Sequence, residues 1–170
     1  MTGYCSNNPI VMTTLLNIAL MYAILIGVNI PAPFLGLQFE SREGGRTWYQ
    51  PPSYFIPAVW FVLFTLLGIA RSKAVAIDRL DIAWYILSLA ILCAAYAYYT
   101  LGLAKLTGIS ALRFGLWGNV AVIVLTLLAC SRAYPASPAV AILIAPVAVW
   151  TSFATLIVLK QMRLSHSNNP

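Results

Sequence analysis

The sequence predicts an all-helical membrane protein, a bundle of five transmembrane helices formed as a single domain of 170 residues. Hydrophobic residues make up 61% of the chain and charged residues only 8%, whereas a water-soluble domain carries about 25% charged residues. The few charges separate long uncharged runs, and each run approaches the roughly 20 residues that a helix needs to cross a bilayer. Prolines stand beside several of these runs, where they favour helix ends.

Charges and prolines set the limits of the predicted spans. Residues 1–39 carry no charge, and Pro31 ends the first span; no basic segment precedes it, which favours a first helix over a cleaved signal peptide. Pro57 suits the first turn of the second span, and Pro146 should kink the fifth. The loop 34–53 is long for a bundle, and such loops are often functional lids. The predicted spans are 10–30, 54–70, 82–104, 114–131 and 139–159.

The net charge of +6 is spread along the chain in single residues and pairs, which is typical of membrane-facing ends and not of a nucleic-acid-binding surface. Five spans place six basic residues on the C-terminal side and four on the N-terminal side, so the positive-inside rule favours an N-out, C-in orientation. All the acidic residues fall outside the spans, which argues against transport coupled to a buried carboxylate.

No motif for catalysis or metal binding is present. The three cysteines fit no zinc or disulfide pattern, and His166 is the only histidine. No nucleophile motif or phosphate-binding loop appears, so the sequence predicts neither catalytic residues nor a metal site.

The segment WYQPPSYFIPAVW, residues 48–60, concentrates aromatic side chains and prolines at the start of the second span. One interpretation is an interfacial aromatic belt with proline stops. The other is a rigid mouth for a flat apolar ligand, because Trp60 lies one turn inside the span and Phe64 follows on the same helical face.

Trp150 is a second candidate, because it lies in the middle of the fifth span and not at a membrane edge. Either it packs between helices or it lines a cavity, where Ala154, one turn further on, would leave room. Asn119 is expected to bond across helices. Three aromatic residues near the end of the third span are assigned to the membrane interface: Tyr96, Tyr98 and Tyr99.

These two aromatic segments resemble the TspO/MBR family of tryptophan-rich sensory proteins and translocator proteins. Residues 48–60 match its pattern of two aromatics, Pro-Pro, and a proline three residues before a tryptophan. Residues 146–155, PVAVWTSFAT, are similar to its Pro-Tyr-x-x-Trp-x-x-Phe-Ala-Thr segment. The order and separation of the two segments agree with the family, as do the chain length and the number of spans.

The resemblance implies a five-helix bundle, often a homodimer, with a pocket beneath the first loop. The family binds porphyrins, haem-related tetrapyrroles and, in some members, sterol-like molecules, so a tetrapyrrole or chlorophyll-type pigment is the expected ligand and no cofactor is required. In this chain, Trp60 and Trp150 would form pocket walls, with Phe64 and Ala154 beside them. A lid hinge would come from four residues: Trp48, Tyr49, Pro51 and Pro52.

The sequence departs from the family at positions that usually carry polar or aromatic pocket groups. The third span has Ser88, Leu92 and Ala95 where the family usually has glutamine, asparagine and tryptophan, and Val158 replaces an asparagine in the fifth. Polar groups fix the orientation of a ligand in an apolar pocket. The departures indicate a more apolar ligand, weaker porphyrin selectivity, or a fold retained for assembly.

Three functions therefore remain open: a membrane sensor or transport-type protein that binds a tetrapyrrole, a structural or regulatory subunit of a larger complex such as a pigment-bearing one, and a light-dependent porphyrin-degrading enzyme. The third has no general acid or base in its favour.

Overall fold

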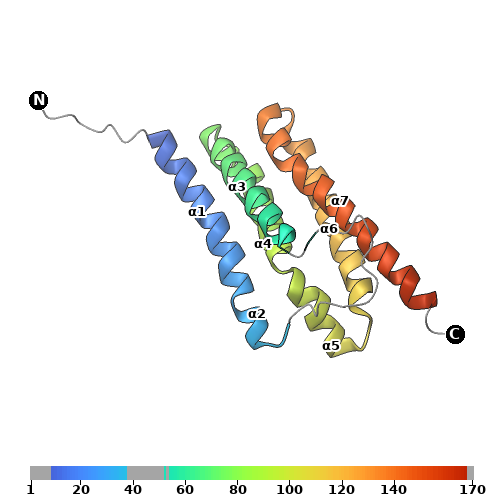
Figure 1. The fold of residues 1–170 in the computed structure, drawn as a ribbon. Coiled ribbons are helices and arrows are strands. Elements are labelled where there is room, and N and C mark those ends of the chain that lie inside the picture. Colours follow the sequence, from blue (N-terminus) through green and yellow to red (C-terminus); the bar gives the residue numbers. More distant parts are fainter. Residues whose placement is uncertain (1–8, 38–51, 53, 168–170) are drawn as a thin grey trace, which may run out of the picture.

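A computed structural model describes residues 9–37, 52 and 54–167 of the chain (Figure 1). Within these ranges the regular elements are all helices, which confirms the predicted all-helical class. The loop predicted at 34–53 lies mostly outside the described residues.

The first helix, α1 (Pro9–Asn29), is followed after one residue by the short helix α2 (Pro31–Phe34). Proline at the first position of α2 lacks the N–H that would continue α1, so the break falls where the sequence places it. Lys105 Nζ donates to the Gly36 carbonyl at 2.6 Å, and this hydrogen bond holds the residues that follow α2 against the end of the predicted third span.

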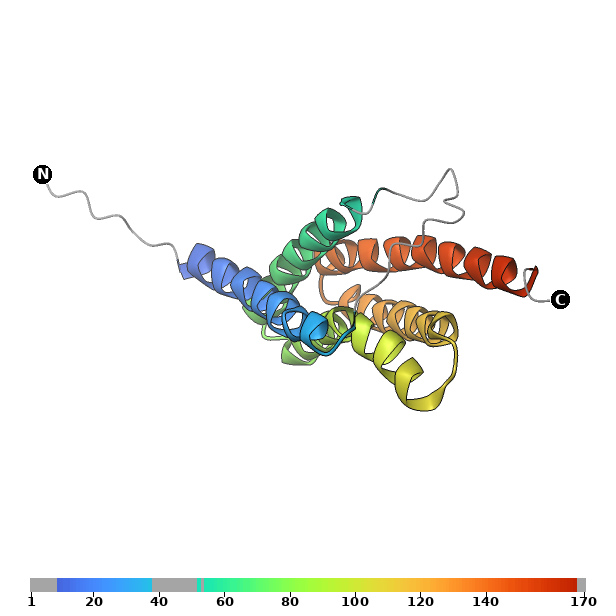
Figure 2. The same ribbon diagram turned by 60° about the horizontal axis from the view of Figure 1, so that its bottom comes forward.

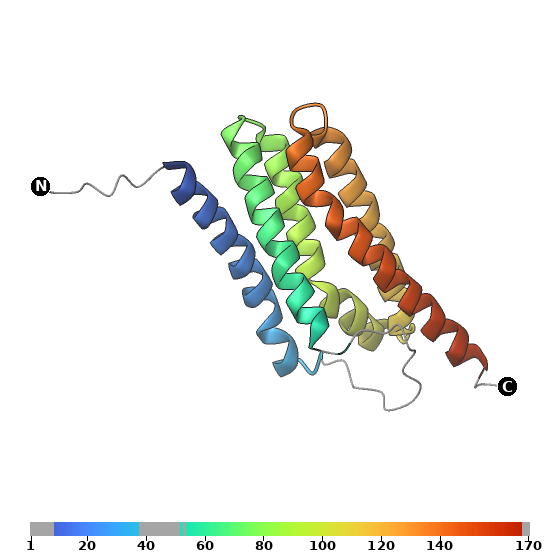
Figure 3. The same cartoon turned by 45° about the horizontal axis from the view of Figure 1, so that its top comes forward.

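Helix α3 (Phe55–Ala76) runs antiparallel to α1, and the two lie side by side in Figures 1 and 3. A hydrogen bond of 2.6 Å joins the hydroxyls of Tyr22 and Thr65, and Arg71 donates to the amide oxygen of Asn17. The second span was expected to end near Ala70, before Arg71, but the helix continues to Ala76. A charge marks the membrane edge and need not end a helix, because the side chain can find a polar partner.

Gly68 allows α1 and α3 to approach closely. A Cβ atom at this position would come 2.7 Å from the Cα of Ile18, which is backbone and cannot rotate away. We expect Gly68→Ala to force the helices apart and to lower the stability by about 1–3 kcal/mol. Thermal unfolding in lipid nanodiscs measures this loss.

Gly27→Ala is the matched control, because Gly27 lies on the same helix pair and a Cβ there meets nothing within 4 Å. We expect it to leave the unfolding midpoint unchanged or to raise it slightly, since alanine favours helix. Equal midpoints for the two variants would contradict the close approach at Gly68.

The third span is bent. Helix α4 (Leu80–Ala94) gives way to a π-helical segment, η1 (Tyr98–Gly102), and to α5 (Leu103–Thr107), with a change in direction of 54°. The sequence predicts a span over 82–104, and the structure covers this stretch with a bent pair of helices; the bend falls at residues 95–97, which contain neither proline nor glycine. Gly108 ends α5 in the left-handed conformation, with φ of 72°.

The last two helices, α6 (Ala111–Ala133) and α7 (Pro138–Ser167), form a hairpin and pack extensively against each other (Figure 2). The Ser110 side chain caps α6 by accepting from the Leu112 N–H at 3.3 Å. α7 runs through Pro146 as one helix and continues beyond the predicted end at 159.

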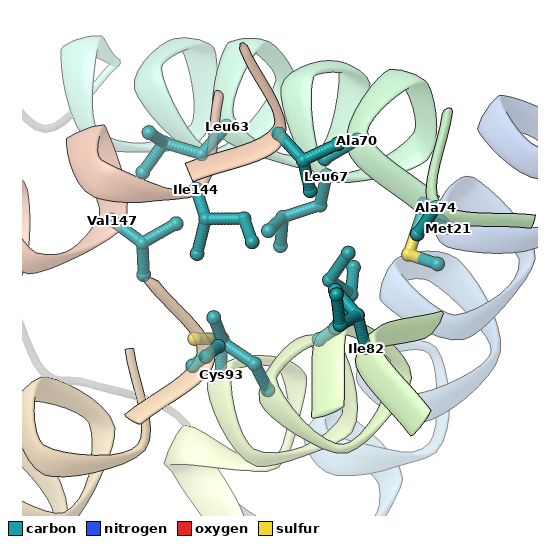
Figure 4. Close-up of a cluster of buried hydrophobic side chains, with 14 of the residues drawn as sticks. Met21, Leu63, Leu67, Ala70, Ala74, Ile82, Cys93, Ile144 and Val147 are labelled. Atoms are coloured by element: carbon teal, nitrogen blue, oxygen red, sulfur yellow. The ribbon is translucent and has the colours of Figure 1, made fainter. Parts of the chain in front are cut away.

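The core lies where α3 meets its neighbours α1, α4 and α7 (Figure 4). Leu67 of α3, Ile86 of α4 and Ile144 of α7 are fully buried there. Lipid-facing side chains on the outer helices are large and apolar, as in a membrane bundle, where interior and exterior are both hydrophobic.

Among the described residues, four helices are long and apolar enough to span a membrane, and the bent pair at residues 80–107 gives a fifth if it counts as one span. The chain is thus a multi-pass membrane protein. The exact count of five, the single domain and the N-out orientation stay predictions.

Candidate ligand-binding site

The first wall of the candidate site is Trp60, in the second turn of α3. Its indole meets the Phe64 ring edge-on, with ring centroids 6.2 Å apart, and packs against the core while staying half-buried. Phe64 itself is fully buried. Phe64 therefore braces Trp60 from within the core, and of the two rings only Trp60 retains a surface that a ligand could reach.

The second wall is Trp150 of α7, which also packs half-buried against the core. Its ring lies 6.4 Å from that of Phe55, the first residue of α3, and 5.7 Å from that of Phe153. Phe55 thus links the two helices that carry the tryptophans, and it is still 46% exposed. Ala154, one turn after Trp150, is half-buried and adds little bulk.

Trp48, Tyr49 and Pro51, predicted to form the lid hinge, lie outside the described residues. Pro52 is described and half-buried, and its carbonyl accepts from the Phe55 N–H at 2.9 Å. This turn leads the chain directly into α3, so it helps to fix the position of Phe55 at the candidate site.

The positions at which the sequence departs from the family differ in their surroundings. Ser88 is exposed, Leu92 and Ala95 are half-buried, and Val158 is buried. None of these side chains brings a buried polar group to the site.

Two open hollows in the described part of the chain lie elsewhere. One, of about 460 Å³, is formed at the α6–α7 turn by residues that include Cys130 and Ile142. The other, of about 510 Å³, runs along the outer face of α6 beside Trp117. Neither is lined by a predicted site residue.

Sequence reasoning missed the setting of the tyrosines in the bent span. Tyr98 donates to the Val28 carbonyl of α1 at 2.7 Å, and the rings of Tyr96 and Tyr99 lie against Gly115 and Gly118 of α6. These are contacts between helices, and the assignment of the tyrosines to the membrane interface stays a prediction. The available signal was the shared spacing of three residues in both pairs, tyrosines on one helix and glycines on another.

Fold and contacts together define a polytopic helical membrane protein with aromatic walls on two neighbouring helices. The family model described as TspO/MBR family matches residues 25–163, which is most of the chain. The chain therefore belongs to the TspO/MBR family, and the resemblance drawn from its two aromatic segments is confirmed. A comparison with curated proteins found no match.

Proposed function

We propose that the protein binds a flat apolar ligand, of which a tetrapyrrole is the leading candidate, between Trp60 of α3 and Trp150 of α7, in a sensing or transport role. The observation that carries the proposal is the placement of these indoles: both are half-buried, both pack on the same core, and Phe55 links their helices. Aromatic faces held on neighbouring helices suit a planar ring system, which stacks without needing charged partners. Family membership supports the same ligand class.

Titration of the purified protein with protoporphyrin IX tests this proposal. Trp84 and Trp117 are 62% and 56% exposed on outer faces, so a Trp84→Phe/Trp117→Phe background removes signal from lipid-facing indoles. We expect saturable quenching of the remaining tryptophan fluorescence, at a stoichiometry near one porphyrin per chain. Empty nanodiscs correct for porphyrin dissolved in lipid, and quenching that only rises linearly with porphyrin would refute the site.

A second candidate function is that of a structural or regulatory subunit in a larger membrane complex, for example a pigment-bearing one. The observation in its favour is that the open hollows on α6 and α7 face outward, where a neighbouring protein could be seated. Native electrophoresis after extraction in mild detergent distinguishes the two. A monomer or homodimer without copurified pigment, judged by its absorption spectrum, would count against the subunit role.

A further inference from the structure

Four side-chain polar atoms in the described part of the chain are buried without a hydrogen-bond partner. One is Nε of Arg71, whose guanidinium already bonds Asn17 through another nitrogen. The remaining atoms are on η1, α6 and α7: Tyr99 Oη, Asn119 Nδ2 and Thr151 Oγ1. Buried polar groups are nearly always paired, so three such groups on adjacent helices call for an explanation.

Thr151 differs from other threonines in the bundle. The hydroxyls of Thr65, Thr126 and Thr155 each donate to the carbonyl four residues earlier, at 2.8, 2.6 and 2.7 Å. That bond satisfies a threonine within its own helix. Thr151 is only 3% exposed, yet its hydroxyl lacks a partner and stays available to another group.

Asn119 and Thr151 lie at the same depth in the bundle. The register of the hairpin is given by Cys130 Sγ, which donates to the Ala141 carbonyl at 3.5 Å. Asn119 precedes Cys130 by eleven residues and Thr151 follows Ala141 by ten, so both lie about 15–17 Å from this point at 1.5 Å per residue. Each is 3% exposed, so both face the interior of the bundle.

Tyr99 belongs to the same level. Its ring covers Gly118, where an added Cβ would come 2.1 Å from Tyr99 Cε2, and Gly118 is the residue before Asn119. Trp150, the α7 wall of the candidate site, is likewise the residue before Thr151. Thr151 therefore lies at the depth of Trp150, and Asn119 and Tyr99 lie at about the same depth on α6 and η1. We name Tyr99, Asn119 and Thr151 the polar layer.

The chemistry of the polar layer selects its ligand. An amide Nδ2 can only donate hydrogen bonds, and the two hydroxyls can donate as well, so the shared partner is an oxygen acceptor. We propose that the polar layer binds a carbonyl or carboxylate oxygen on the rim of the flat ligand. This inference rests on the function proposed above. The polar groups that recognise the ligand would come from η1, α6 and α7, whereas the polar residues that the family usually has at positions 92 and 158 are replaced here by Leu92 and Val158. A π-helical segment such as η1 is a frequent feature of functional sites.

Two porphyrins test the proposal: protoporphyrin IX, which carries two carboxylates, and etioporphyrin, which carries only alkyl groups. We expect wild type to bind the dicarboxylate about tenfold more tightly, after correction for partition into empty nanodiscs, since one satisfied buried hydrogen bond has that effect. Asn119→Leu and Thr151→Val, which keep the side-chain volume, should each remove most of this preference and leave etioporphyrin binding unchanged. Thr126→Val is the matched control, because its hydroxyl is buried on α6 but already bonded to Val122, and it should keep the preference.

The unfolding midpoint of the ligand-free protein gives an independent measure. Asn119→Leu removes an unpaired donor and should leave the midpoint unchanged or raise it, whereas a structural asparagine would lower it. Equal binding of the two porphyrins to wild type would contradict ligand binding by the polar layer and would mean that water occupies it. The proposed site between the tryptophans would not be affected by this result. Failure of both porphyrins to bind would overturn the proposed function and the polar layer together.

Discussion

Replacing Trp60 and Trp150 together with leucine should weaken protoporphyrin IX binding by about tenfold or more. Each indole offers a flat face held by neighbouring rings, Trp60 by Phe64 and Trp150 by Phe153. An aromatic pair contributes about 0.5–1.5 kcal/mol beyond the area it buries, so losing two such faces accounts for a factor of that size. Because the variant lacks the two tryptophans of the candidate site while three others remain, the titration is followed by the shift of the porphyrin absorption band.

The matched control for this prediction is Trp84→Leu/Trp117→Leu, which also removes two tryptophans. Both indoles are more than half exposed, on the outer faces of α4 and α6. This variant should bind with wild-type affinity. An equal loss of binding in both double variants would show that the titration reports general tryptophan content or stability, and the site between α3 and α7 would be wrong.

Hydropathy and charge predicted the helical class and the approximate positions of the helices, because lipid permits little else for long uncharged runs. The break at residues 95–97 could not be predicted in this way. Local sequence there is alanine and tyrosine, with no proline or glycine to signal it. At the bend the backbone hydrogen bonds change, because the backbone N–H groups of Tyr98 and Tyr99 both donate to the Ala95 carbonyl. Side-chain contacts with α1 and α6 hold the tyrosines in place.

In the candidate site, too, some features could be predicted from the sequence and others could not. Trp60 and Trp150 could be proposed as site residues from the sequence, because a tryptophan inside a predicted span, away from the membrane edge, is unusual. The polar layer could not be proposed in this way, since Asn119 was expected to bond across helices and its amide nitrogen has no partner. Whether a buried group is paired depends on which helices face one another, and single-span periodicity carries no such information.

The contact between Tyr99 and Gly118 leads to the largest expected effect on stability. A valine at 118 would place its Cβ 2.1 Å from the Tyr99 ring, so the ring must leave its position against α6. Overpacking of this kind costs about 1–3 kcal/mol, and we expect Gly118→Val at or above the upper end, because displacing the ring also disturbs the bend at η1. The midpoint of thermal unfolding in nanodiscs should fall accordingly.

A second substitution separates this clash from a general intolerance of valine on α6. Tyr99→Ala removes the ring and is itself destabilising, but in the Tyr99→Ala background Gly118→Val meets no ring and should cost far less than it does in wild type. Contacting residues are non-additive in this way, and the double-mutant cycle measures the coupling directly. Strictly additive losses of stability would mean that Tyr99 does not cover Gly118. The placement of Tyr99 at the depth of Asn119 would then be wrong.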